Sequence, residues 1–175
     1  INRKGMVLCK YDKIHMYDVT ITKNQSYQES KTYESGETAK IAKLKVNGKY
    51  YKIGMTICYD LRFPHLFRDL ALKGADLITV PSVFMHITGK DHWHSLLKAR
   101  AIETGCYIVA PAQYGRYFNK RKSYGHSLII SPWGKILKDA KTEKNIIVSD
   151  IDKNQIKIAR SKIPSLFINK KYKIN

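Results

Sequence analysis

The sequence predicts an α/β fold, because short apolar runs typical of buried strands alternate with segments of helical spacing. An apolar run at residues 50–57 predicts a buried strand, and a helical pattern begins at Pro64. A second pair of strand and helix follows, with a run at 75–80 that predicts a wholly buried strand and a helical pattern at 91–104. The 175 residues are enough for one domain with a substantial core.

The first part of the chain predicts a strand, a long loop and a hairpin. Residues 5–11 form a short apolar run, which predicts a strand. Residues 18–38 are polar and lack a clear period, so we expect a long loop lying over a site. Asn47-Gly48 separates apolar runs at 41–46 and 50–57, and this dipeptide is the strongest short signal for a hairpin.

The rest of the chain continues the alternation of strand and helix. The predicted elements are a helix at 64–73 ending at Gly74, a strand at 75–80, a loop at 81–89, a helix at 91–104 ending at Gly105, a strand at 106–110, a basic loop at 116–123, a hairpin of strands at 127–131 and 135–138, a strand at 145–149, a helix at 153–162 and a basic tail at 169–175.

The net charge of +18 raises the possibility of a protein that binds nucleic acid or anionic membranes. Only seven of the 32 basic residues are arginine, and the lysines are scattered along the whole chain. Nucleic-acid sites more often concentrate arginine and aromatic residues on one face, so we expect no nucleic-acid partner.

Membrane association and a secretory route are also not expected. No apolar stretch approaches the length of a membrane span, and no signal peptide precedes the first predicted strand. The three cysteines show no paired spacing, which favours a reducing compartment. The predicted location is therefore cytoplasmic.

Cys58 lies where a predicted strand ends and a predicted helix begins. Backbone N–H groups at the positive end of a helix favour a thiolate and can stabilise an oxyanion on a bound substrate. The alternative is a buried structural cysteine, because free cysteines are among the most buried residue types. The position of Cys58 alone leaves both interpretations open.

The residues around Cys58 carry a resemblance to a known family. They read Ile57-Cys58-Tyr59-Asp60-Leu61-Arg62-Phe63-Pro64. Five other motifs occur in order along the chain: Tyr11-Asp12-Lys13-Ile14-His15, Tyr27-Gln28-Glu29-Ser30, His92-Trp93, Arg100-Ala101-Ile102-Glu103-Thr104 and Tyr124-Gly125-His126-Ser127. This ordered set resembles the carbon-nitrogen hydrolase (nitrilase) superfamily over nearly the whole chain.

The resemblance implies a four-layer α-β-β-α sandwich that assembles as a homo-oligomer. It also implies that residues 1–175 form one carbon-nitrogen hydrolase domain that lacks the first strands and helix. The family's general base is a glutamate ahead of the lysine, whereas this chain has no acidic residue before Asp12. Without that base, we expect turnover to fall by about 10²- to 10⁴-fold.

The resemblance also implies the role of each site residue. Cys58 is the nucleophile that attacks the amide carbon, ammonia leaves, and water hydrolyses the thioester. The ammonium of Lys13 and the backbone N–H of Tyr59 stabilise the oxyanion, and Glu29 positions that ammonium and the substrate amide. The residues expected around the oxyanion and substrate are Tyr59, Arg62 and Phe84.

No cofactor and no metal are expected. His92 and His94 could be taken for a pair of metal ligands, but residues i and i+2 of a helix point apart. The sequence offers no evident third ligand for them. For His126, a structural role is the favoured interpretation.

The substrate is predicted from the segments at 99–107, 113–116 and 122–127, which look more like deaminated glutathione amidases than like omega-amidases. Deaminated glutathione is a small, peptide-like amide with several carboxylates. Arg116 and Arg121 at the site entrance would suit such an anion. Three alternatives remain: an omega-amidase acting on alpha-keto acid amides, a non-catalytic basic domain that binds polyanions, and an inert truncated product.

Overall fold

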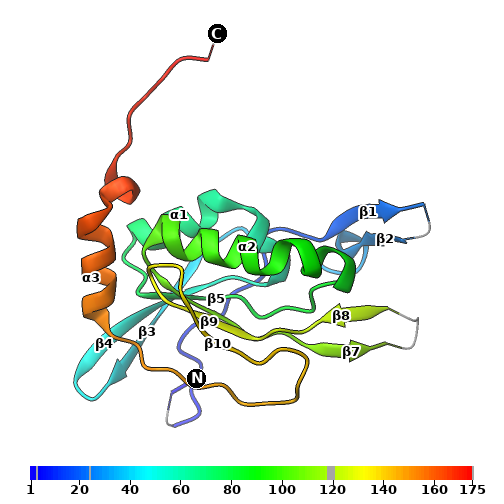
Figure 1. The fold of residues 1–175 in the computed structure, drawn as a ribbon, viewed down its shortest axis with the longest axis horizontal. Helices are drawn as coiled ribbons and strands as arrows, with labels where there is room; N and C mark the ends of the chain where they lie inside the picture. The colour runs from blue at the N-terminus through cyan, green and yellow to red at the C-terminus, as the bar shows by residue number, and fades with distance from the viewer. Residues whose placement is uncertain (3, 24, 118–120, 175) are drawn as a thin grey trace.

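The computed structural model describes residues 1–2, 4–23, 25–117 and 121–174 (Figure 1). In chain order the elements are β1 (Asp18–Thr22), β2 (Gln25–Gln28), η1 (Glu29–Lys31), β3 (Lys40–Val46), β4 (Lys49–Met55), η2 (Cys58–Arg62), α1 (Pro64–Leu72), β5 (Leu77–Thr79), α2 (His86–Thr104), β6 (Tyr107–Ala110), β7 (Tyr114–Arg116), β8 (Lys122–Tyr124), β9 (Leu128–Ile130), β10 (Ile136–Asp139), α3 (Lys153–Lys162) and η3 (Pro164–Phe167), where η marks a short 3₁₀ helix.

A six-stranded mixed sheet in the order β10-β9-β6-β5-β4-β3 lies at the centre. Strands β4, β5 and β6 are parallel, and the outer strands join them in antiparallel pairs. Parallel neighbours need crossover connections, which α1 and α2 supply here. Both helices lie over the same face of the sheet (Figure 1).

The core lies between these two helices and the sheet. Phe67 of α1 and Trp93 of α2 are fully buried against Ile78 and Ile108 of the central strands. A Cβ atom at Gly54 would lie 3.1 Å from Ile78 Cγ1 and 3.2 Å from Leu70 Cδ1. Glycine at this position of β4 therefore lets α1 approach the strand that leads to Cys58.

Most predicted elements of the central sheet are confirmed. The β3–β4 hairpin turns at Asn47-Gly48, where both residues have positive φ. Gly105 ends α2 in the left-handed conformation, with φ 60°. The helix predicted at 153–162 is α3, and its N-cap Asp152 accepts a hydrogen bond from the backbone N–H of Asn154.

Two predicted strands are wrong. Residues 5–11 pair with no strand among the described residues, and the same holds for residues 145–149. Ile146 and Val148 are 86% and 72% exposed. Apolar alternation predicts a strand only where a partner strand can bury its side chains, and the described chain offers none here.

Three predicted loops contain regular structure. The segment at 18–38 holds the β1–β2 hairpin and η1, and the basic loop at 116–123 contributes to the β7–β8 hairpin, although its residues 118–120 lie outside the described part. Helix α2 begins at His86, inside the predicted loop at 81–89. The predicted loop ended at Gly89, which lies inside the helix. A Cβ atom at this position would lie 2.5 Å from Tyr124, so glycine permits close packing of α2 against β8.

The α/β class is confirmed. Of the four layers that the resemblance implies, the described residues form one large sheet and one helical layer. Both two-stranded hairpins, β1–β2 and β7–β8, project from the same end of the molecule (Figure 1). In the described part of the chain, no helix is long and apolar enough to cross a membrane.

Candidate active site

A pocket of about 760 Å³ lies between the two hairpins and the ends of the central strands. Of the predicted site residues, those that line it are Lys13, Glu29, Cys58, Tyr59, Arg62, Phe84 and Arg121. Arg116 is exposed on β7 and is not among the lining residues. The structure thus brings together all of the predicted residues except one.

Cys58 lies at a sharp turn after β4. Its φ is +48°, which is uncommon for a residue other than glycine and often marks a functional position. Its backbone N–H donates to Pro81 O at 2.9 Å, which ties the turn to the end of β5. The predicted elbow differs in one respect, because the five-residue 3₁₀ helix η2 separates Cys58 from α1, which begins at Pro64.

Burial raises the pKa of the Cys58 thiol above its ordinary value. The Lys13 ammonium, the Val83 backbone N–H and the Ser82 hydroxyl act in the opposite direction and do not outweigh burial. The helix end is not among these causes, so the expectation that it favours a thiolate stays a prediction. A base must remove the proton before Cys58 can act as a nucleophile.

The raised pKa predicts how Cys58 reacts with iodoacetamide. Only the thiolate reacts, so the alkylation rate should rise with pH, with a midpoint above about 8.5, the ordinary cysteine value. Lys13→Met removes a positive charge beside the sulfur and should move the midpoint to still higher pH. Mass spectrometry of the Cys58 peptide over time measures this, and an unchanged midpoint in the variant would contradict the predicted coupling.

Lys13 and Glu29 form an ion pair beside Cys58. The Lys13 side chain is only 10% exposed, so its ammonium lies largely out of water. Glu29 begins η1, and its Oε2 also accepts the backbone N–H of Tyr17 at 2.6 Å. The carboxylate thus holds the ammonium and joins the β1–β2 hairpin to residues 11–17, the loop that carries Lys13 and is called the lysine loop below.

A buried carboxylate, Asp60, connects the lysine loop to the turn that carries Cys58. From the loop, Asp60 accepts the Tyr11 hydroxyl and the His15 Nδ1, both at 2.7 Å, and the His15 backbone N–H at 3.1 Å. From the turn, it accepts the Ile57 N–H at 2.9 Å. These bonds fix the segment of Lys13 relative to that of Cys58.

Tyr59, Arg62 and Phe84, which are predicted to surround the oxyanion and substrate, all line the pocket. The Asp60 N–H donates to Ile57 O and closes the first turn of η2. The Tyr59 N–H lies one residue earlier in this turn, where an N–H group has no partner within the helix. The Arg62 guanidinium lies 5.4 Å from the centre of the buried Phe84 ring. It also donates from Nη2 to His92 Nδ1 at 3.2 Å.

Several lining residues were not identified from the sequence. Tyr17, whose pKa burial and the neighbouring Tyr27 raise to about 12, has no motif around it. Ser82 and Gln113 enter through the loops after β5 and β6, and the Gln113 N–H donates to Ser82 O at 3.0 Å. The carboxyl ends of parallel strands commonly form sites in α/β folds, and that rule could have identified both loops.

Residues 1–161, which include every residue that lines the pocket, match the carbon-nitrogen hydrolase family. The chain therefore belongs to this family.

Its relatives include a deaminated glutathione amidase from Dictyostelium discoideum, 44% identical over 99% of this chain and 60% of the relative. Another, from Synechocystis, is 42% identical over 93% of this chain and 59% of the relative. The chain thus spans about three fifths of their length. The solved structure of Saccharomyces cerevisiae Nit3, a member of branch 10 of the nitrilase superfamily, matches with TM-score 0.78 at 33% identity, over 93% of this chain and 55% of Nit3.

Proposed function

We propose that this protein is an amidase that hydrolyses deaminated glutathione through a thioester on Cys58 and releases ammonia. The observation that carries the proposal is the placement of a partly buried cysteine beside the Lys13–Glu29 pair in one pocket. Relatives over 40% identical are deaminated glutathione amidases, which favours this substrate over those of the alternatives.

In this reaction the Cys58 sulfur attacks the amide carbon after losing its proton. The Lys13 ammonium and the Tyr59 N–H stabilise the negative charge that develops on the carbonyl oxygen. Collapse of the tetrahedral intermediate breaks the C–N bond, and ammonia leaves after taking up the proton that the Cys58 thiol gave to a base. Water then attacks the thioester, which releases the carboxylate product and the Cys58 thiol.

The charge of the pocket suits an anionic substrate. Among the described residues, the charged ones that line it are Lys13, Arg62, Arg121 and one carboxylate, Glu29. Three basic groups and one carboxylate give the described lining an excess of positive charge. The Arg121 guanidinium lies 4.3 Å from the centre of the Tyr27 ring, which places it over the β1–β2 side of the pocket.

Ammonia release tests this function. The protein expressed from its whole gene is supplied with deaminated glutathione and, separately, with alpha-ketoglutaramate. We expect faster release from deaminated glutathione. Preference for alpha-ketoglutaramate would favour the omega-amidase alternative, and no release from either substrate would overturn the proposal.

Arg121→Gln should weaken substrate binding more than catalysis. Loss of one charge-assisted bond to a carboxylate is expected to raise KM about 10-fold, with a smaller change in kcat. Arg116→Gln is the matched control, because Arg116 lies on the same hairpin but does not line the pocket. Equal KM values in the two variants would contradict a role for Arg121 in substrate recognition.

We also propose a cytoplasmic homo-oligomer. Exposed apolar residues near the C-terminal end support self-association: Phe167, Ile168, Tyr172 and Ile174. Sedimentation analysis measures the assembly state, and a monomer at micromolar concentration would contradict it.

A further inference from the structure

A cluster of two histidines and one carboxylate lies outside the residues that line the pocket. It consists of His94 of α2, His126 of the segment before β9, and Asp139 at the end of β10. One ligand atom from each residue lies within 4.8 Å of the other two. All three side chains are partly exposed, so solvent and ions can reach them.

The distances from Asp139 to the two histidines suit a small metal ion. His126 Nδ1 lies 3.1 Å from each carboxylate oxygen of Asp139, and His94 Nε2 lies 3.4 Å from Asp139 Oδ2. A tetrahedral zinc ion with bonds of about 2.0–2.1 Å holds its ligand atoms about 3.3–3.4 Å apart. The 3.4 Å contact between His94 and Asp139 is long for a hydrogen bond but fits two ligands of one ion.

The surrounding contacts hold two of the three ligands, Asp139 and His126. Asp139 Oδ1 accepts the Lys141 backbone N–H at 2.7 Å, which orients the carboxylate. The backbone of His126 is held at both ends, because its carbonyl accepts the Trp93 indole N–H at 2.8 Å and its N–H donates to Lys141 O at 2.6 Å. A hydrogen bond to a ligating carboxylate, like the one at Asp139, is typical of metal sites.

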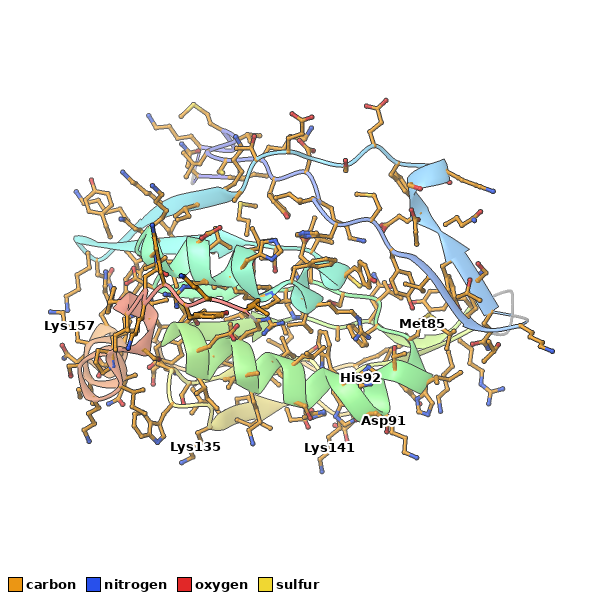
Figure 2. The ribbon with its side chains drawn as sticks, turned by 90° about the horizontal axis from the view of Figure 1, so that it is seen from above. Met85, Asp91, His92, Lys135, Lys141 and Lys157 are labelled. Carbon is orange, nitrogen blue, oxygen red and sulfur yellow. The ribbon has the colours of Figure 1, made fainter. Side chains whose placement is uncertain are left out.

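An aromatic ring packs against both histidines of the cluster. The Tyr124 ring stacks on His126 with centroids 4.5 Å apart, and it meets His94 edge-on at 5.9 Å. In Figure 2, Lys141 and Asp91 lie at the same edge of the molecule, so the segment after β10 runs beside the first half of α2. The three ligands therefore come from three elements that meet at this edge.

We propose that His94, His126 and Asp139 bind a zinc ion that joins α2 to the β9–β10 hairpin. Two imidazoles and one carboxylate supply three ligands, and water completes the coordination. The sequence did not show this site because the ligands are far apart in the chain, and because the only neighbouring histidine that could be paired with His94 was His92. In the structure His92 instead accepts a hydrogen bond from Arg62.

Zinc titration of the full chain by calorimetry tests the site. Cys58 is first alkylated with iodoacetamide, because its thiol could also bind zinc. We expect one ion per chain, and an affinity at least about 100-fold lower in His94→Ala and in Asp139→Asn. His92→Ala is the matched control from the same helix and should bind zinc like the parent chain.

Cobalt(II) provides a second measurement on the parent chain, which depends on no variant folding. Tetrahedral binding by nitrogen and oxygen gives visible absorption without the sulfur charge-transfer band that a cysteine ligand would add. Unchanged zinc affinity in His94→Ala, loss of binding after Cys58 alkylation, or no binding by the parent chain would each overturn the proposal. In those cases the cluster is a hydrogen-bonded His–Asp–His group only.

Discussion

Replacing Cys58 with alanine is expected to reduce ammonia release from deaminated glutathione by at least about 10³-fold. The sulfur forms the bond to the amide carbon in the proposed reaction, and no other nucleophile can replace it at the same point of the turn. Because the side chain is small and lies at the pocket wall, the variant should fold like the parent protein. Steady-state assays of both proteins, with circular dichroism to compare folding, measure the effect.

Two controls make this result specific to Cys58. Cys9→Ala removes another free cysteine that does not line the pocket and should leave the rate unchanged. Cys58→Ser keeps the shape but supplies a hydroxyl that Lys13 and its neighbours are not arranged to ionise, so it should also be inactive. Substantial ammonia release by Cys58→Ala would refute the proposed thioester.

The central sheet could be predicted because its signals are local. The Asn47-Gly48 turn, the positive φ of Gly105 and the helical pattern after Pro64 each depend on neighbouring residues only. The hairpins β1–β2 and β7–β8 lacked such signals. Strands β2, β7 and β8 are short and mostly polar, so their residues resemble those of loops. Strand β1 reads Asp-Val-Thr-Ile-Thr, and this alternation of β-branched residues could have predicted it.

The candidate site was predicted from motifs, and its chemistry was not. The motifs correctly placed Lys13, Glu29 and Cys58 in one pocket. The raised pKa of Cys58 depends on how deeply the folded chain buries the sulfur, which no local pattern reports. In the same way, Asp60 belongs to a motif but had no predicted role. The structure shows that its carboxylate connects the loop of Lys13 to the turn of Cys58.

Asp60→Ala is expected to lower the free energy of unfolding by about 3–5 kcal/mol. The side chain is fully buried and accepts hydrogen bonds from Tyr11, His15 and Ile57. Alanine would leave these donors without their acceptor, and each buried donor that stays unsatisfied costs about 1–3 kcal/mol. Urea unfolding with comparison of midpoints and slopes measures the loss.

Asp12→Ala separates the effect of burial from that of charge. Asp12 lies beside Lys13 in the same loop, but its side chain is exposed and pairs with Lys10 at 3.2 Å, a surface contact worth less than about 1 kcal/mol. If the two variants lose equal stability, the buried network contributes no more than a surface ion pair. A much larger loss in Asp60→Ala, together with a lower kcat when substrate is saturating, would mean that the same bonds that stabilise the fold also hold Lys13 against Cys58.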